Sequence, residues 1–249
     1  MAKYRAILFD LFGTVALLDP EKLPLFEWNG QTTRSTLGAL RTLYAQQVPD
    51  VPFSQFFAAL THVARELEKE RALQLREVSC VQRFLLTLIR AGLADSSATR
   101  CLAEELAVAH AALLASATEV PLGHASFLAQ ACARYNVALV TNFDHGPTAR
   151  RILHVGGVKE HFRQIVISEE HGWRKPHPLI FTDTLEALGV KPHEALFVGD
   201  SPIEDIVGAN RVGMDIAWVN AHNSALPDGI PVPDYTVQAI PELQLFLFD

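Results

Sequence analysis

The feature that most constrains this chain is an apolar run, residues 4–9, that ends in a carboxylate, Asp10. After two more residues come Gly13 and the hydroxyl of Thr14. A short apolar run bounded by glycine is typical of a buried strand in a parallel sheet. In open α/β sheets, ligands bind just beyond the carboxyl ends of the strands. Asp10 is therefore a candidate nucleophile, a candidate metal ligand, or both.

Two later segments repeat this form, since each is an apolar run that ends in small polar residues. Residues 137–140 are followed by Thr141 and Asn142, and residues 195–198 by Gly199, Asp200 and Ser201. Between them along the chain lies Lys175, followed by Pro176. Because parallel strands end at one edge of a sheet, we expect the polar residues of these segments to meet there.

The sequence from residue 119 onward alternates short strand-like runs with helical spacing. The predicted strands of the whole chain are residues 4–9, 137–140, 164–167, 195–198, 216–219 and 235–237. Strands that alternate with helices imply right-handed crossovers and a parallel sheet with helices on both faces. The predicted fold class is α/β, with a doubly wound parallel sheet.

A different pattern occupies residues 17–118, where three stretches carry apolar residues at helical spacing. No strand is predicted there, and Ser54 is the expected cap of one helix. Residues 1–16 and 119–249 are thus predicted to form the catalytic core, and residues 17–118 an inserted helical cap. A helical segment placed directly after the first strand can act as a lid that excludes water.

The composition limits the partners and the compartment. Net charge is −7 with no block of like charge, which argues against nucleic acid, because binding its backbone needs clustered Lys and Arg. No apolar run approaches the ~20 residues that span a membrane. Three widely spaced cysteines indicate free thiols in a reducing compartment. We expect a cytoplasmic protein without a signal peptide.

Taken in order, these motifs resemble those of the haloacid dehalogenase superfamily, and the resemblance covers nearly the whole chain. The matching residues are Asp10, Thr141-Asn142, Lys175-Pro176 and Gly199-Asp200-Ser201 with Asp205. The resemblance implies a Rossmann-like core with a helical cap after the first motif. It also implies a hydrolase that uses Mg²⁺ and acts on a small anionic substrate through a covalent intermediate.

The resemblance also assigns a metal site and the nucleophile. Mg²⁺ would be held by Asp10, by the backbone carbonyl of Phe12 and by Asp200. Converging carboxylates repel one another unless a cation intervenes, and a site of hard oxygen ligands suits Mg²⁺. Asp205 would lie next to the metal site without binding the ion. Asp10 would attack the substrate, and Thr14 would orient the loop beside it.

Three further residues are predicted to bind the substrate. Thr141 and Asn142 would donate hydrogen bonds to a phosphoryl group, and Lys175 would neutralise both Asp10 and the incoming anion. Phosphoryl transfer depends mainly on positioning and on stabilisation of charge, so one fixed cation is expected at this place.

The sequence departs from the family's phosphatases at Phe12. Those enzymes usually carry a second Asp at this position, which protonates the leaving group. A phenyl ring cannot carry a proton, and general acid–base help is worth roughly 10²–10⁴ in rate. An ordinary alkyl phosphate is therefore expected to be a poor substrate unless another group substitutes.

Three interpretations remain open. The preferred one is a Mg²⁺-dependent phosphohydrolase for a substrate with a good leaving group, such as an acyl phosphate or a phosphonate, or for one that a residue of the cap helps to react. The second is a 2-haloacid dehalogenase, because a halide leaves without a proton; Arg34 and Arg41 are candidate halide contacts. The third is a binding or regulatory protein without turnover. The sequence does not identify the substrate or distinguish a monomer from a homodimer.

Overall fold

The computed structural model describes residues 3–248. The chain divides into two compact units. The core unit comprises Met1–Leu17 and Glu119–Asp249, and the cap unit comprises Leu18–Thr118. The insert expected from the sequence, residues 17–118, begins one residue earlier than this division. That the cap unit acts as a lid stays a prediction.

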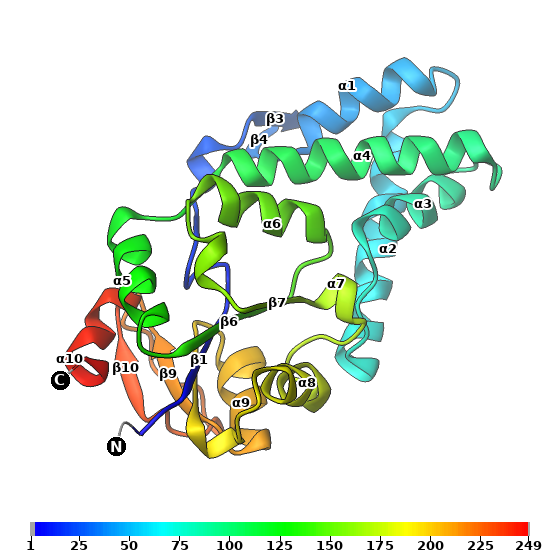
Figure 1. Cartoon of the computed structure of the whole chain (residues 1–249). Coiled ribbons are helices and arrows are strands. Elements are labelled where there is room, and N and C mark those ends of the chain that lie inside the picture. Colours follow the sequence, from blue (N-terminus) through cyan, green and yellow to red (C-terminus); the bar gives the residue numbers. More distant parts are fainter. Residues whose placement is uncertain (1–2, 249) are drawn as a thin grey trace. The chain divides into compact units, whose positions relative to one another are not determined.

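A six-stranded parallel sheet forms the centre of the core unit (Figure 1), in the order β10-β9-β8-β1-β6-β7. Its strands are β1 (Ala6–Phe9), β6 (Asn136–Thr141), β7 (Gln164–Ile167), β8 (Ala195–Gly199), β9 (Asp215–Val219) and β10 (Tyr235–Val237). All six are predicted from the sequence, and the doubly wound α/β fold is confirmed. The central strand β1 is buried on both faces, which explains its unbroken apolar run.

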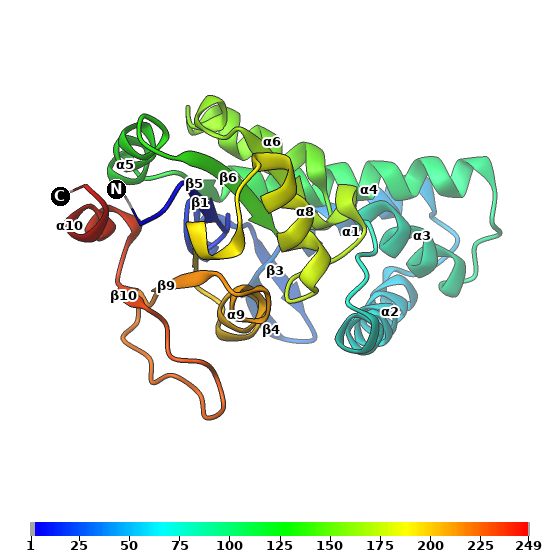
Figure 2. The ribbon, with the colours of Figure 1, turned by 60° about the horizontal axis from the view of Figure 1, so that its bottom comes forward.

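Helices cover both faces of this sheet (Figure 2). They are α5 (Leu122–Cys132), α6 (Gly146–Val155), α7 (Ser168–His171), α8 (Pro178–Leu188), α9 (Gly208–Val212) and α10 (Gln244–Leu247). Successive strand residues point to opposite faces. Leu8 shares a buried cluster with Phe181 of α8. The ring of Phe9 meets Phe127 of α5 edge-on, with centroids 6.3 Å apart.

The helical segment that follows β8 is irregular in the structure. A π-helical turn, η4 (Pro202–Val207), precedes α9. Within it, the N–H groups of Asp205 and Ile206 both donate to the carbonyl of Ser201, at 3.0 and 3.2 Å. Such turns are frequent at functional sites. Apolar periodicity does not distinguish a π turn from an α-helix, so the sequence could not reveal this irregularity.

Four helices pack around one hydrophobic cluster in the cap unit. They are α1 (Leu37–Gln47), α2 (Phe53–Gln74), α3 (Cys80–Arg90) and α4 (Ser97–Ser116). The cluster includes Tyr44, Phe56, Phe84, Leu88 and Leu106. Ser54 was the expected cap of α2, but this prediction is wrong: Pro52 precedes the helix, and Ser54 lies inside its first turn. None of the helices within residues 3–248 has both the length and the apolar character needed to cross a bilayer.

The prediction that the insert contains no strand is also wrong. A hairpin joins β3 (Leu25–Trp28) to β4 (Gln31–Arg34) through Asn29 and Gly30. Both turn residues have positive φ angles, 51° and 76°, and Asn-Gly is the preferred pair for such a turn. The four residues of β4 are polar and exposed, so no apolar alternation marks this strand. The Asn29-Gly30 pair was the sequence feature that indicated a hairpin here.

The remaining short elements connect these parts. They are η1 (Pro20–Lys22), η2 (Lys159–His161), η3 (Pro192–Glu194), η5 (Ile240–Leu243), and the two-residue strands β2 (Leu17–Leu18) and β5 (Thr118–Glu119), which pair with each other. The segment containing η5 and α10 buries Leu243 and Leu247 against the rest of the core unit.

The close packing at Gly208 predicts a stability difference between two Gly→Ala substitutions. A Cβ atom on Gly208 would lie 2.5 Å from Cζ of the fully buried Phe181, so Gly208→Ala should lower the free energy of unfolding by about 1–3 kcal/mol. The matched control is Gly123→Ala in α5, where the added Cβ would meet Pro241 at an ordinary 3.6 Å. That variant should be stabilised by up to about 1 kcal/mol, because alanine favours a helix. Urea unfolding of both variants measures the difference, and equal effects would contradict it.

Candidate active site

The site is built at the carboxyl edge of three adjacent strands. β1 lies between β6 and β8, with Phe9 opposite Leu139 on one side and Val198 on the other. The main-chain N–H of Asp10 donates to the carbonyl of Val198 at 2.9 Å. The residues that follow these strands are therefore held at one edge of the sheet, as the sequence predicts.

Lys175 is the cation of this site. Its side chain is 1% exposed, and its Nζ atom lies 2.6 Å from Oδ1 of Asp10 and 2.7 Å from Oδ1 of Asp205. Burial by itself would lower the pKa of the ammonium, but the two carboxylates outweigh it and raise the pKa above its ordinary value. Lys175 is therefore charged at all physiological pH values and orients the nucleophile candidate, Asp10.

The amide of Asn142 fixes the main chain at Lys175. Its Nδ2 donates to the Lys175 carbonyl at 2.9 Å, and its Oδ1 accepts from the Lys175 N–H at 2.8 Å. Thr141, at the end of β6, is buried. Asn142 thus has a positioning role that the sequence did not indicate. Substrate binding by Thr141 and Asn142 stays a prediction.

Three carboxylates converge beside Lys175. One oxygen from each of Asp10, Asp200 and Asp205 lies within 4.8 Å of the others. Both oxygens of Asp205 are engaged, because Oδ2 accepts from the Ser201 N–H at 2.9 Å while Oδ1 contacts Lys175. Burial raises the pKa of Asp205, and the Lys175 ammonium opposes this shift. Asp205 therefore serves mainly to position the Lys175 ammonium.

Asp200 is the exposed member of this cluster and comes close to the loop after β1. A Cβ atom on Gly13 would lie 2.4 Å from Oδ2 of Asp200, and Gly13 has a φ of +74°. Only glycine fits there, for both reasons. Its carboxyl group is partly shielded from water by the surrounding protein. This desolvation and the negative charge of Asp10 raise the pKa of Asp200 to about 6. The Asp200 carbonyl accepts a hydrogen bond from Nε1 of Trp218 at 3.0 Å.

The side chain of Thr14 is also part of the loop after β1. Its Oγ1 atom is buried and makes no hydrogen bond to any residue of the described range 3–248. Beneath the same loop, His124 of α5 is buried with its Nδ1 atom 3.2 Å from the carbonyl of Val15. Burial lowers the pKa of His124, so this side chain supports the loop as a neutral ring. No sequence motif points to His124.

Two aromatic rings meet where the loops after β1 and β6 come together. Phe12, in the loop after β1, meets Phe143, in the loop after β6, with ring centroids 5.0 Å apart and an interplanar angle of 65°. Both side chains are half-buried. The sequence interpretation noted Phe12 but missed Phe143, since nothing in the order of motifs shows that the two loops are neighbours.

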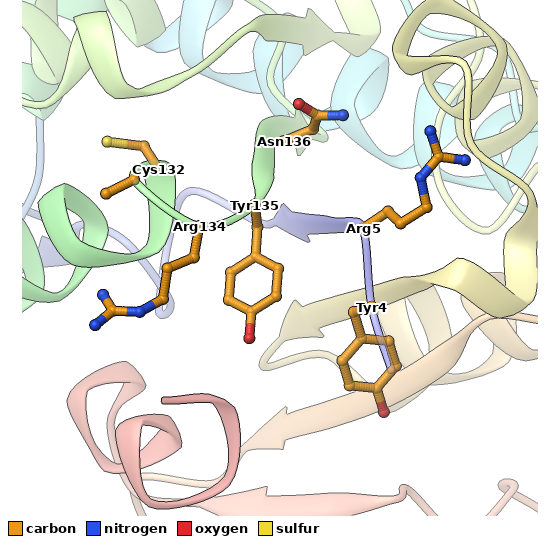
Figure 3. A pocket seen from close by; sticks show the side chains of 7 residues that line it. Tyr4, Arg5, Cys132, Arg134, Tyr135 and Asn136 are labelled. Carbon is orange, nitrogen blue, oxygen red and sulfur yellow. The ribbon is translucent and has the colours of Figure 1, made fainter. Parts of the chain in front are cut away.

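A hollow of about 400 Å³ lies at the other edge of the sheet, before β1 and β6 (Figure 3). Its lining carries no carboxylate, and its polar groups are largely bonded elsewhere. The hydroxyl of Tyr4 donates to Asp215, Arg5 contacts Glu194, and the hydroxyl of Tyr135 donates to the Leu247 carbonyl. The Cys132 thiol also lines the hollow and contacts the Ala129 carbonyl and His161. Because no carboxylate lies there to bind a metal ion, the carboxyl edge is the better candidate for the predicted chemistry.

A comparison with models of protein families identifies the family of this chain. A model described as a haloacid dehalogenase-like hydrolase matches residues 4–213. The chain belongs to the haloacid dehalogenase-like hydrolases. The matched range includes Asp10, Asn142, Lys175, Asp200 and Asp205, so the whole acidic cluster and its cation lie inside the family's region.

Curated relatives include members with two kinds of activity. A glyceraldehyde 3-phosphate phosphatase from Methanopyrus kandleri is 42% identical over 92 residues, which cover 35% of this chain and 39% of the relative. A haloacetate dehalogenase H-2 from a Moraxella species is 31% identical over 90 residues, covering 36% of this chain and 40% of the relative. The chain therefore spans less than half the length of either relative.

A solved structure matches over nearly the full length. The 2-haloacid dehalogenase from Pseudomonas syringae pv. Tomato DC3000 superposes with a TM-score of 0.76, covering 98% of both chains at 24% identity. At this identity the likeness shows the fold alone. The haloacid dehalogenase-like fold is thus established, whereas the choice between phosphatase and dehalogenase chemistry has to come from the site.

The raised pKa of Asp200 predicts a pH-dependent gain in stability when its charge is removed. An acid with a raised pKa costs stability as pH rises from its unfolded value, 3.8, to its folded value of about 6, and the cost is complete above that range. Asp200→Asn should therefore raise the melting temperature in EDTA more at pH 7.5 than at pH 5. Asp228→Asn, in the exposed loop before β10, controls for the loss of one negative charge. An equal gain at both pH values would contradict the prediction.

Proposed function

We propose that this chain is a Mg²⁺-dependent phosphohydrolase that acts on a small phosphorylated or phosphonate substrate with a good leaving group. The observation that carries the proposal is the Lys175 ammonium between Asp10 and Asp205, with Asp200 close by. Such a site offers a nucleophile, a cation for an incoming anion, and carboxylates for a metal ion. The proposal includes a small anionic molecule as the binding partner, with no nucleic acid or membrane, and a cytoplasmic monomer or homodimer.

The donor set fits Mg²⁺. All the candidate ligands are oxygens, which Mg²⁺ prefers, and the approach of the Gly13 loop to Asp200 leaves no room for a larger residue. Asp10, the backbone carbonyl of Phe12 and Asp200 would hold the ion. When bound, it would offset the negative charge of the carboxylates and of the phosphoryl group.

The chain's own residues account for the bond changes. Lys175 engages Oδ1 of Asp10, which leaves Oδ2 to attack phosphorus while the leaving group departs with the bonding electrons. Water then attacks phosphorus, the bond to Oδ2 breaks, and the Asp10 carboxylate is restored, while the protons of the water leave with the inorganic phosphate and the solvent. Thr14 would orient the loop beside Asp10. Phe12 donates no proton, so the leaving group must depart without one.

The dehalogenase interpretation is the alternative, and Phe12 favours it, because a halide also leaves without a proton. Asp200 argues against it. Its negative charge lies beside that of Asp10, and a carboxylate substrate would add a third charge without a metal ion to offset it. The acidic cluster is therefore better explained by a metal-dependent reaction. A binding protein that lacks turnover is the remaining alternative.

A metal titration separates these three functions. With acetyl phosphate as substrate, phosphate release should rise with Mg²⁺ and disappear in Asp10→Asn, which keeps the shape of the side chain but removes the nucleophile. The matched control is Asp228→Asn, a charge-neutralising change on an exposed loop. Chloride release from 2-chloropropionate that persists in EDTA would instead support a dehalogenase. Binding without turnover of either compound would support a binding protein.

Supplying the missing acid should widen the range of substrates. Phe12→Asp places a carboxyl group where the family's phosphatases carry one, so hydrolysis of glycerol phosphate should rise, on the order of 10²-fold. Phe12→Asn is the control, because it has nearly the same shape but cannot transfer a proton. An equal gain in both variants would contradict a role in proton transfer.

A further inference from the structure

The two half-buried rings of Phe12 and Phe143 lie in the loops that carry the reacting groups. Phe12 is two residues after Asp10 and two before Thr14, and Phe143 directly follows Asn142, which fixes Lys175. Any group attached to the reacting atom of a substrate must fit among these loops. Since both loops border the reacting groups, Phe12 and Phe143 are candidates to contact that group.

The main chain that carries each ring is fixed by hydrogen bonds or by a β-bridge. The N–H of Phe143 donates to Oγ of the buried Ser168 at 3.0 Å, and the same hydroxyl donates to the Phe143 carbonyl at 3.3 Å. Phe12 is held by a β-bridge to Ala16. The edge-to-face contact of the rings then fixes one against the other. The pair is a preformed apolar surface, which is the kind of surface that binds a ligand without first being ordered.

We propose that Phe12 and Phe143 together form an apolar wall that selects substrates with an aromatic or bulky alkyl group next to the reacting centre. Phe143 is the specificity-determining residue of this wall, and Phe12 supports it. The inference rests on the proposed function and narrows it to anions that combine a phosphoryl group with an apolar substituent. Lys175 and the acidic cluster would bind the charged end, and the two rings the apolar end.

Binding of two phosphonates tests the wall without requiring turnover. Methylphosphonate and benzylphosphonate share the charged group and differ in the apolar one. In excess MgCl₂, calorimetry of the wild type should give about tenfold tighter binding of benzylphosphonate, since burying a phenyl group favours binding by at least that factor. In Phe143→Ala this preference should fall to about threefold or less, with methylphosphonate affinity little changed.

A matched control is Phe246→Ala, since Phe246 is also a partly exposed ring that contacts one aromatic neighbour, Tyr235, at 5.2 Å, but lies in α10. It should keep the full preference. If Phe143→Ala does not fold, Phe143→Leu replaces it, and its smaller side chain should still reduce the preference. A wild type that binds both phosphonates equally, or neither, overturns the inference, as does a preference that survives both changes at Phe143.

The two proposals can fail separately. Turnover of acetyl phosphate without any preference for benzylphosphonate would overturn the wall and leave the phosphohydrolase standing. A benzyl preference that is lost in Phe143→Ala, without turnover of any phosphate, would support the wall and overturn the phosphohydrolase.

Discussion

The buried ammonium of Lys175 is the interaction on which the rest of the site depends. It is almost inaccessible to water and touches two carboxylates. A buried charge that loses its partner is strongly destabilising, so the elements around it must keep Asp10 and Asp205 in place. Three features fix these groups. The main chain at the end of β1 holds Asp10, the π-helical turn holds Asp205, and the amide of Asn142 holds the main chain of Lys175.

The charges at this edge do not balance within the protein. Three carboxylates and one ammonium leave two negative charges when all are ionised. The raised pKa of Asp200 reflects this excess. A divalent cation would offset it, and the neutralised site could then accept an anion. Glycine at positions 13 and 199 allows the required crowding, because a Cβ atom at either would lie under 2.5 Å from an aspartate oxygen.

The sequence predicted most of the acidic cluster and of the sheet, because each polar residue of the site directly follows an apolar run or lies in a loop between two such runs. Asp10, Lys175, Asp200 and Asp205 were predicted to converge, and the structure brings them together. The six strands were predicted as well, since a sheet buried on both faces requires apolar runs. The β3–β4 hairpin was missed, because its second strand is polar throughout.

The sequence by itself determined which chemical groups are available and that they follow strands, since apolar runs and their polar ends are local properties. Only the tertiary structure decided which groups touch. The order of strands places β1 between β6 and β8, and this brings Phe143 against Phe12 and Lys175 between two carboxylates. Such contacts join residues more than a hundred positions apart in some cases. They depend on strand order and on helix irregularities that leave no periodic pattern in the chain.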